Sequence, residues 1–108
     1  MEKIDCTTKI VCLEALPVMR TILLVEDEKI IAKTEARMLK KHGFEVVLAY
    51  DGETAIETVR AEDVDLILMD IDLGHDRMDG TESAERILKD HNIPIVFRTT
   101  QAEKEKLN

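Results

Sequence analysis

The chain has 108 residues, of which 44% are hydrophobic and 3% aromatic, and its formal net charge is -8. This length excludes a second full-sized domain, and the apolar fraction suffices for a core despite the charge. The acidic balance and the scarcity of aromatic rings argue against direct nucleic-acid binding. No apolar run is long enough for a membrane span or a signal peptide, so we expect a cytoplasmic protein that does not bind membranes.

Residues 1–20 differ in composition from the rest of the chain. They hold three acidic and three basic side chains, so the whole negative excess lies in residues 21–108. Met19 directly precedes the first strong strand pattern. We therefore expect residues 1–20 to be an N-terminal extension or linker and residues 21–108 to form the domain.

From residue 21 onward, strand and helix patterns alternate. Residues 22–25 form an apolar run that stops at three acids, as expected of a strand buried on both faces. Apolar side chains then recur at helical spacing between Ile30 and Leu39, and Gly43 is placed to end this helix. On this pattern Met38 is expected in the core.

The remaining segments continue the alternation. Further strands are expected at residues 46–49, 64–69 and 94–97. The two helices between these strands would bury the following side chains: Ala55, Ile56 and Val59, then Ala84, Ile87 and Leu88. The order βαβαβαβ predicts an open α/β fold, with a parallel sheet covered by helices.

Polar residues follow three of the predicted strands. They are Glu26 and Asp27, then Asp70 and Asp72, then Thr99 and Thr100. Open parallel sheets bind ligands beyond the C-terminal ends of their strands, so these side chains are the candidate site. Crowded carboxylates favour a bound hard cation. Magnesium suits Asp27 and Asp70 as direct ligands, with Glu26 acting through water.

Four segments, taken in order, resemble the receiver domain of two-component response regulators. They are ILLVEDE at residues 22–28, LILMDIDL at 66–73, MDG at 78–80 and IPIVFRTT at 93–100. The match runs from about residue 21 to the end of the chain. It implies a flavodoxin-like, doubly wound parallel sheet. It also implies phosphorelay signalling, with a sensor histidine kinase or phosphotransfer protein as the partner.

The resemblance also implies a role for each candidate residue. Asp70 would be the phospho-acceptor, and Glu26 and Asp27 would be the acidic pair that places Mg²⁺. Asp72 would bind the metal through its backbone carbonyl. Thr99 and Thr100 would be the switch residues, and the hydroxyl of Thr99 would turn toward the phosphoryl group. A carboxylate accepts a phosphoryl group only when the negative charge that develops between it and the donor is neutralised, and the bound metal would neutralise it. The chain would then be a switch and not an enzyme, with no catalytic residue beyond the acceptor.

The C-terminal end departs from the family. Receivers usually continue through a further strand, ending in a lysine that pairs with the phosphoryl group, and a further helix, whereas this chain stops at Asn108. We therefore expect an incomplete receiver with an exposed sheet edge that favours self-association. Arg98 stands where the family has an apolar strand residue, so it is expected to be exposed at that edge or paired with an acid.

Two other functions remain open at this point. Without the lysine, the domain could be a degenerate receiver that is not phosphorylated and acts as a protein-binding module. Asp70-Ile71-Asp72 also matches the Asp-x-Asp start of a phosphatase of the haloacid dehalogenase type. Against the phosphatase, Gly74 holds the later Thr or Val position of that pattern, and the chain has no room for a large cap.

Overall fold

The computed structural model describes residues 20–73 and 78–99. The expected extension at residues 1–20, except for its last residue, and Thr100 lie outside the described residues. Within these described residues, seven elements alternate: β2 (Thr21–Val25), α1 (Lys29–Lys41), β3 (Glu45–Ala49), α2 (Gly52–Ala61), β4 (Leu66–Asp70), α3 (Gly80–Asp90) and β5 (Ile95–Arg98). The predicted element order is confirmed. The third and fourth strands start later than predicted, at residues 66 and 95 instead of 64 and 94.

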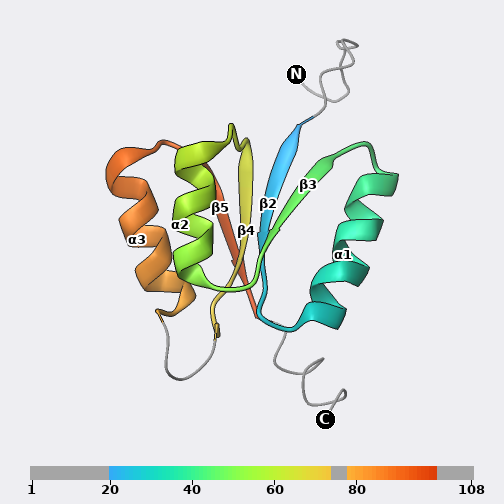
Figure 1. Ribbon diagram of the computed structural model, residues 1–108, viewed down its shortest axis with the longest axis horizontal. Helices are drawn as coiled ribbons and strands as arrows, with labels where there is room; N and C mark the ends of the chain where they lie inside the picture. The colour runs from blue at the N-terminus through green and yellow to red at the C-terminus, as the bar shows by residue number, and fades with distance from the viewer. Residues whose placement is uncertain (1–19, 74–77, 100–108) are drawn as a thin grey trace.

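The four strands form one parallel sheet in the order β3-β2-β4-β5. Their C-terminal ends all lie at the lower edge of the sheet in Figure 1. From β2 the chain crosses to β3 on one side, and it then returns to β4 on the other side. Strand order therefore reverses between β2 and β4, and this reversal point is where open α/β sheets bind their ligands.

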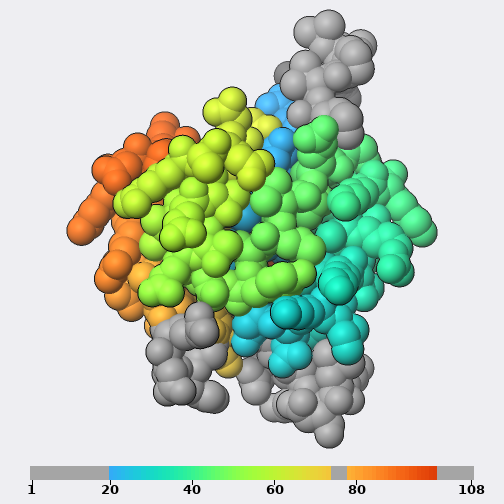
Figure 2. Space-filling view, viewed as in Figure 1, coloured from blue at the N-terminus to red at the C-terminus, as the bar shows by residue number. Residues whose placement is uncertain are grey.

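One face of the sheet is covered by α2 and α3. Alternate strand residues, among them Leu23, Ile67 and Met69, pack there with Val59 of α2 and Ile87 of α3 in a single buried cluster. The two helices contact each other, and together they hide much of the sheet in the space-filling view (Figure 2). In α3 the buried residues are Gly80, Ser83, Ala84 and Ile87. The prediction for Leu88 is wrong, since this side chain is 52% exposed.

The opposite face is covered by α1. The side chains of Ile22 and Leu24, which alternate with those of the first cluster, are buried there. The buried residues of α1 are Ile31, Ala32 and Ala36. Met38 does not continue this stripe, and the expectation that it lies in the core is wrong, because it is 55% exposed.

Helix α1 ends as the sequence predicts. Gly43 has φ +93°, a left-handed conformation that side chains disfavour. Its N–H donates to the carbonyl of Lys40, and the N–H of Phe44 donates to the carbonyl of Leu39. These two hydrogen bonds make a Schellman motif, which turns the chain back toward β3.

None of the helices in residues 20–73 and 78–99 combines the length and apolar character needed to cross a bilayer.

Candidate functional site

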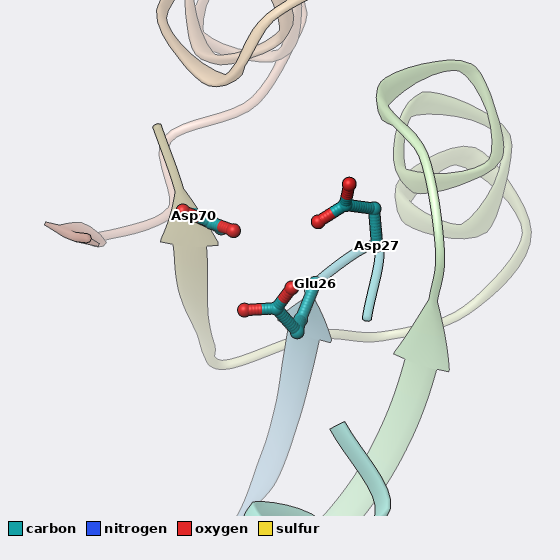
Figure 3. A group of neighbouring side chains, drawn as sticks. All are labelled: Glu26, Asp27 and Asp70. Atoms are coloured by element: carbon teal, nitrogen blue, oxygen red, sulfur yellow. The ribbon is translucent and has the colours of Figure 1, made fainter. Parts of the chain in front are cut away.

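Three acids meet where strand order reverses. Glu26 and Asp27 directly follow β2, and Asp70 is the last residue of β4. One carboxylate oxygen from each residue lies within 4.8 Å of the other two. Figure 3 shows the three side chains turned toward one another across the ends of the two strands. The structure thus brings together the three carboxylates that the sequence assigns to the metal.

Two of these carboxylates are fully buried. Glu26 and Asp70 are 0% exposed, and Asp27 is half-buried. Glu26 Oε2 accepts the N–H of Glu28 at 2.8 Å, and Asp70 Oδ1 accepts the N–H of Asp72 at 3.2 Å. Each buried carboxylate therefore hydrogen-bonds the backbone two residues further on. These bonds offset part of the cost of burying a charge.

The backbone around Asp70 is fixed from two sides. The N–H of Ile71 donates to the carbonyl of Arg98 at 3.1 Å, and the N–H of Gly80 donates to the carbonyl of Ile71 at 3.0 Å. A Cβ at Gly80 would lie 2.3 Å from the carbonyl oxygen of Asp70. Glycine is therefore required for α3 to start this close to the end of β4. The close approach holds Asp70 in place.

The other predicted site residues lie around this group. Asp72 is exposed, and its side chain is not among the three grouped carboxylates. Thr99 directly follows β5 and is also exposed. Thr100 lies outside the described residues. The roles of the Asp72 carbonyl and of the two threonines stay predictions.

An ion pair that the sequence only half revealed lies beside the acids. Both terminal nitrogens of Arg98 donate to the carboxylate of Glu35, so of the two alternatives expected for Arg98, exposure or pairing with an acid, the structure shows pairing. This contact raises the pKa of Arg98 above its usual value, and the charges of Glu26 and Asp70 add to the effect while burial opposes it. Sequence reasoning missed Glu35. The sequence signal that could have identified it is its position, since an acid at residue 35 falls on the same side of α1 as the buried residues Ala32 and Ala36.

The donor set fits a hard divalent cation. All three grouped side chains offer carboxylate oxygens, and no nitrogen or sulfur ligand belongs to the group. Mg²⁺ is bound in proteins by one or two carboxylates together with water and phosphate oxygens. Ionised acids this close repel one another, and a divalent cation relieves that repulsion.

Comparison with known proteins identifies similar chains. A family model described as the response regulator receiver domain matches residues 22–108. The N-terminal domain of a response regulator/sensory box/GGDEF 3-domain protein from Carboxydothermus hydrogenoformans is 47% identical, with a TM-score of 0.71, and the match covers 74% of this chain and 64% of that one.

Two further solved structures are similar. The N-terminal domain of a response regulator receiver protein from Methanoculleus marisnigri JR1 is 32% identical, with a TM-score of 0.68 and coverage of 82% and 76%. Anti-anti-sigma factor PhyR from Bartonella quintana is 30% identical, with a TM-score of 0.66 and coverage of 74% and 33%. The chain therefore spans less than two thirds of the Carboxydothermus structure and about one third of PhyR.

Proposed function

Because the chain belongs to the response regulator receiver domain family, we propose that it accepts a phosphoryl group on Asp70 in a Mg²⁺-dependent reaction and changes conformation in response. Receiver domains are signalling modules that interact with histidine kinases or phosphotransfer proteins, so the family supports a role in phosphorelay signalling. The observation that carries the proposal is the group formed by Glu26, Asp27 and Asp70, whose ligand atoms lie within 4.8 Å of one another.

The transfer itself needs an ionised carboxylate with the phosphodonor in line. A lone pair on a carboxylate oxygen of Asp70 forms the new O–P bond. The P–N bond to a phosphohistidine of the donor breaks, and its electron pair stays on the imidazole, which takes a proton from solvent. With acetyl phosphate as donor, a P–O bond breaks instead and acetate leaves. The product in both cases is an acyl phosphate on Asp70.

The neighbouring acids would hold the metal. Asp27 and Asp70 would supply direct carboxylate ligands, Glu26 would act through water, and the backbone carbonyl of Asp72 would complete the protein's share. When bound, Mg²⁺ neutralises negative charge on the phosphoryl oxygens. Thr99, at the end of β5, would then donate its hydroxyl to the phosphoryl group and so give the loaded domain a different surface.

The direct test is the intact mass of the full chain after incubation with Mg²⁺ and acetyl phosphate. We expect a single phosphoryl adduct on the parent and none on Asp70→Asn, with circular dichroism confirming that both chains are folded. An adduct on both chains would assign the acceptor to another residue.

A second test concerns the metal alone. Asp27→Asn removes one negative charge from the group. We expect the Mg²⁺ affinity measured by calorimetry to fall at least about tenfold, because a loss of this size is typical even for residues that only hydrogen-bond a metal ligand. Glu85→Gln, an exposed carboxylate on α3, is the matched control and should leave the affinity unchanged. Equal affinities in Asp27→Asn and the parent would remove Asp27 from the site.

One observation favours the alternative of a receiver that only binds proteins. Large apolar side chains are exposed on and beside β5, namely Ile71, Val96 and Phe97. Such a surface suits a protein partner or a second copy of the chain. A folded parent that takes up no phosphoryl group would favour this binding module over the phosphorylated switch.

A further inference from the structure

Three charged side chains form a row across the C-terminal edge of the sheet. Asp70 of β4 is the register partner of Arg98 on β5. Val25 of β2 is the register partner of Met69 on β4, and Glu26 is the residue after Val25. Register partners on parallel strands direct their side chains to the same face, and here that face is the one covered by α1. The row Glu26, Asp70 and Arg98 therefore places one cation beside two buried acids.

The guanidinium of Arg98 is bound by Glu35 of α1. Its two terminal nitrogens donate to the two carboxylate oxygens of Glu35, and the Arg98 and Glu35 side chains are only 25% and 19% exposed. The remaining donor, Nε–H, is buried and has no hydrogen-bond partner within the described residues. A buried donor without an acceptor is costly, so this guanidinium is not fully satisfied by Glu35 alone.

The charges of the site already act on Arg98. The negative charges of Glu26 and Asp70 both stabilise its charged form, in addition to the larger effect of Glu35. Phosphoryl transfer would replace the single charge of the Asp70 carboxylate with a group carrying about 1.5 to 2 negative charges near neutral pH. The attraction toward the site would therefore grow while the attraction toward Glu35 stays the same.

We propose that Arg98 exchanges partners: it pairs with Glu35 when Asp70 carries no phosphoryl group and with the phosphoryl oxygens when it does. The planar guanidinium suits both partners, because it donates two parallel hydrogen bonds to a carboxylate or to a phosphoryl group. Loading of the site would then break the ion pair between β5 and α1. This inference rests on the proposed function, and it adds a signal route from Asp70 to α1.

The test uses beryllium fluoride, a noncovalent phosphoryl analogue, titrated with Mg²⁺ into the full chain. Loss of one charge-assisted contact predicts binding at least about tenfold weaker in Arg98→Gln. Glu35→Gln removes the carboxylate that competes with the analogue for Arg98, so the analogue should bind more tightly than it binds to the parent. Opposite signs for the two variants are specific to partner exchange, because damage to the fold would weaken both.

A matched control is available on α3. Arg86 and Glu82 form an exposed ion pair one helical turn apart, and Arg86→Gln should leave binding unchanged. Arg98→Lys keeps the charge but loses the two parallel hydrogen bonds, so it should fall between the parent and Arg98→Gln. If Arg98→Gln does not fold, the sign of the Glu35→Gln effect alone decides the question.

A second readout does not depend on affinity. The Nε–H resonance of Arg98 in NMR spectra should shift when beryllium fluoride and Mg²⁺ are added to the parent. Binding by the parent with unchanged affinity in Glu35→Gln, or with an unmoved Nε–H resonance, would overturn this inference and leave the proposed function standing. A folded parent that binds no analogue and takes no phosphoryl group would overturn both.

Discussion

The two faces of the sheet are built in different ways. Under α2 and α3, the strand residues Leu23, Val25, Ile67 and Met69 are all 0% exposed and belong to one apolar cluster. On the α1 face, Ile22 and Leu24 are buried as well, and β5 is exposed on both faces, with Val96 47% and Phe97 42% exposed. The rows of this second face end in the charged residues Glu26, Asp70 and Arg98.

This difference separates stability from chemistry. Among the described residues, the face under α2 and α3 holds no buried charge, so its packing stabilises the fold without a desolvation penalty for a charged group. The α1 face holds two buried carboxylates and an ion pair, which contribute little net stability. We therefore expect substitutions on the first face to unfold the protein and those on the second to change binding.

The largest effect is expected from Ile67→Ala, at the centre of the apolar cluster. Removing a fully buried isoleucine side chain costs about 2 to 5 kcal/mol of unfolding free energy. Val96→Ala is the counterpart on the other face, where exposure limits the loss to within about 0.5 kcal/mol. Urea unfolding of both variants measures the difference. Similar losses would mean that the two faces are packed equally well.

Gly80→Ala probes the contact between the apolar layer and the site. The added Cβ would lie 2.3 Å from the Asp70 carbonyl oxygen and 2.9 Å from the Cα of Ile71. Both are backbone atoms, so the start of α3 must move, at a cost of about 1 to 3 kcal/mol that exceeds the helix preference of alanine. Mg²⁺ affinity should fall as well. Unchanged stability and unchanged Mg²⁺ affinity together would show that the contact does not position Asp70.

Asp51→Ala compares the helices of the two faces. Asp51 Oδ1 accepts the N–H of Thr54 at 2.7 Å and caps α2, whereas Glu28 at the start of α1 makes no side-chain cap. Loss of the Asp51 cap should lower the unfolding free energy by about 1 kcal/mol. Glu28→Ala is the control and should cost less in the same urea titration. The reverse ranking would contradict the role of the cap.

The smallest effect is a pH dependence from Asp79, which caps α3. Hydrogen bonds from the N–H of Glu82 and the hydroxyl of Thr81 lower the pKa of this exposed carboxyl. Its contribution to stability is therefore present above the ordinary aspartate pKa of about 4 and is lost as the pH falls through the lower folded value. Thermal unfolding of Asp79→Asn should show a flatter acid limb than the parent. Identical acid limbs would assign the loss of stability to other carboxylates.

The strands were predictable because their signals are local. Continuous apolar runs ended by acids identify buried parallel strands, and the ends of such strands meet at one edge, which is why Glu26, Asp27 and Asp70 could be grouped in advance. The start of the third strand was less accurate. Val64 is buried but precedes β4, and hydrophobicity alone does not separate a strand from a buried connection.

The helix faces were harder to predict. Ser83 is buried and Leu88 exposed, because the position of a residue around α3, and not its polarity, decides which side meets the sheet. Glu35 illustrates the same point. This acid lies on the buried side of α1 because it pairs with Arg98, 63 residues further along the chain. Pairings of this kind depend on tertiary contacts that single-sequence patterns do not encode.

The position of β5 in the described sheet has a consequence for amide hydrogen exchange. Within residues 20–73 and 78–99, strands β2 and β4 are each paired on both sides, whereas β5 pairs with β4 alone. Edge strands open more readily than central ones. The backbone amides of β5 should therefore exchange with solvent before the amides of β2 and β4, the strands whose ends hold Glu26 and Asp70. The three acids would then stay together through openings that release Arg98.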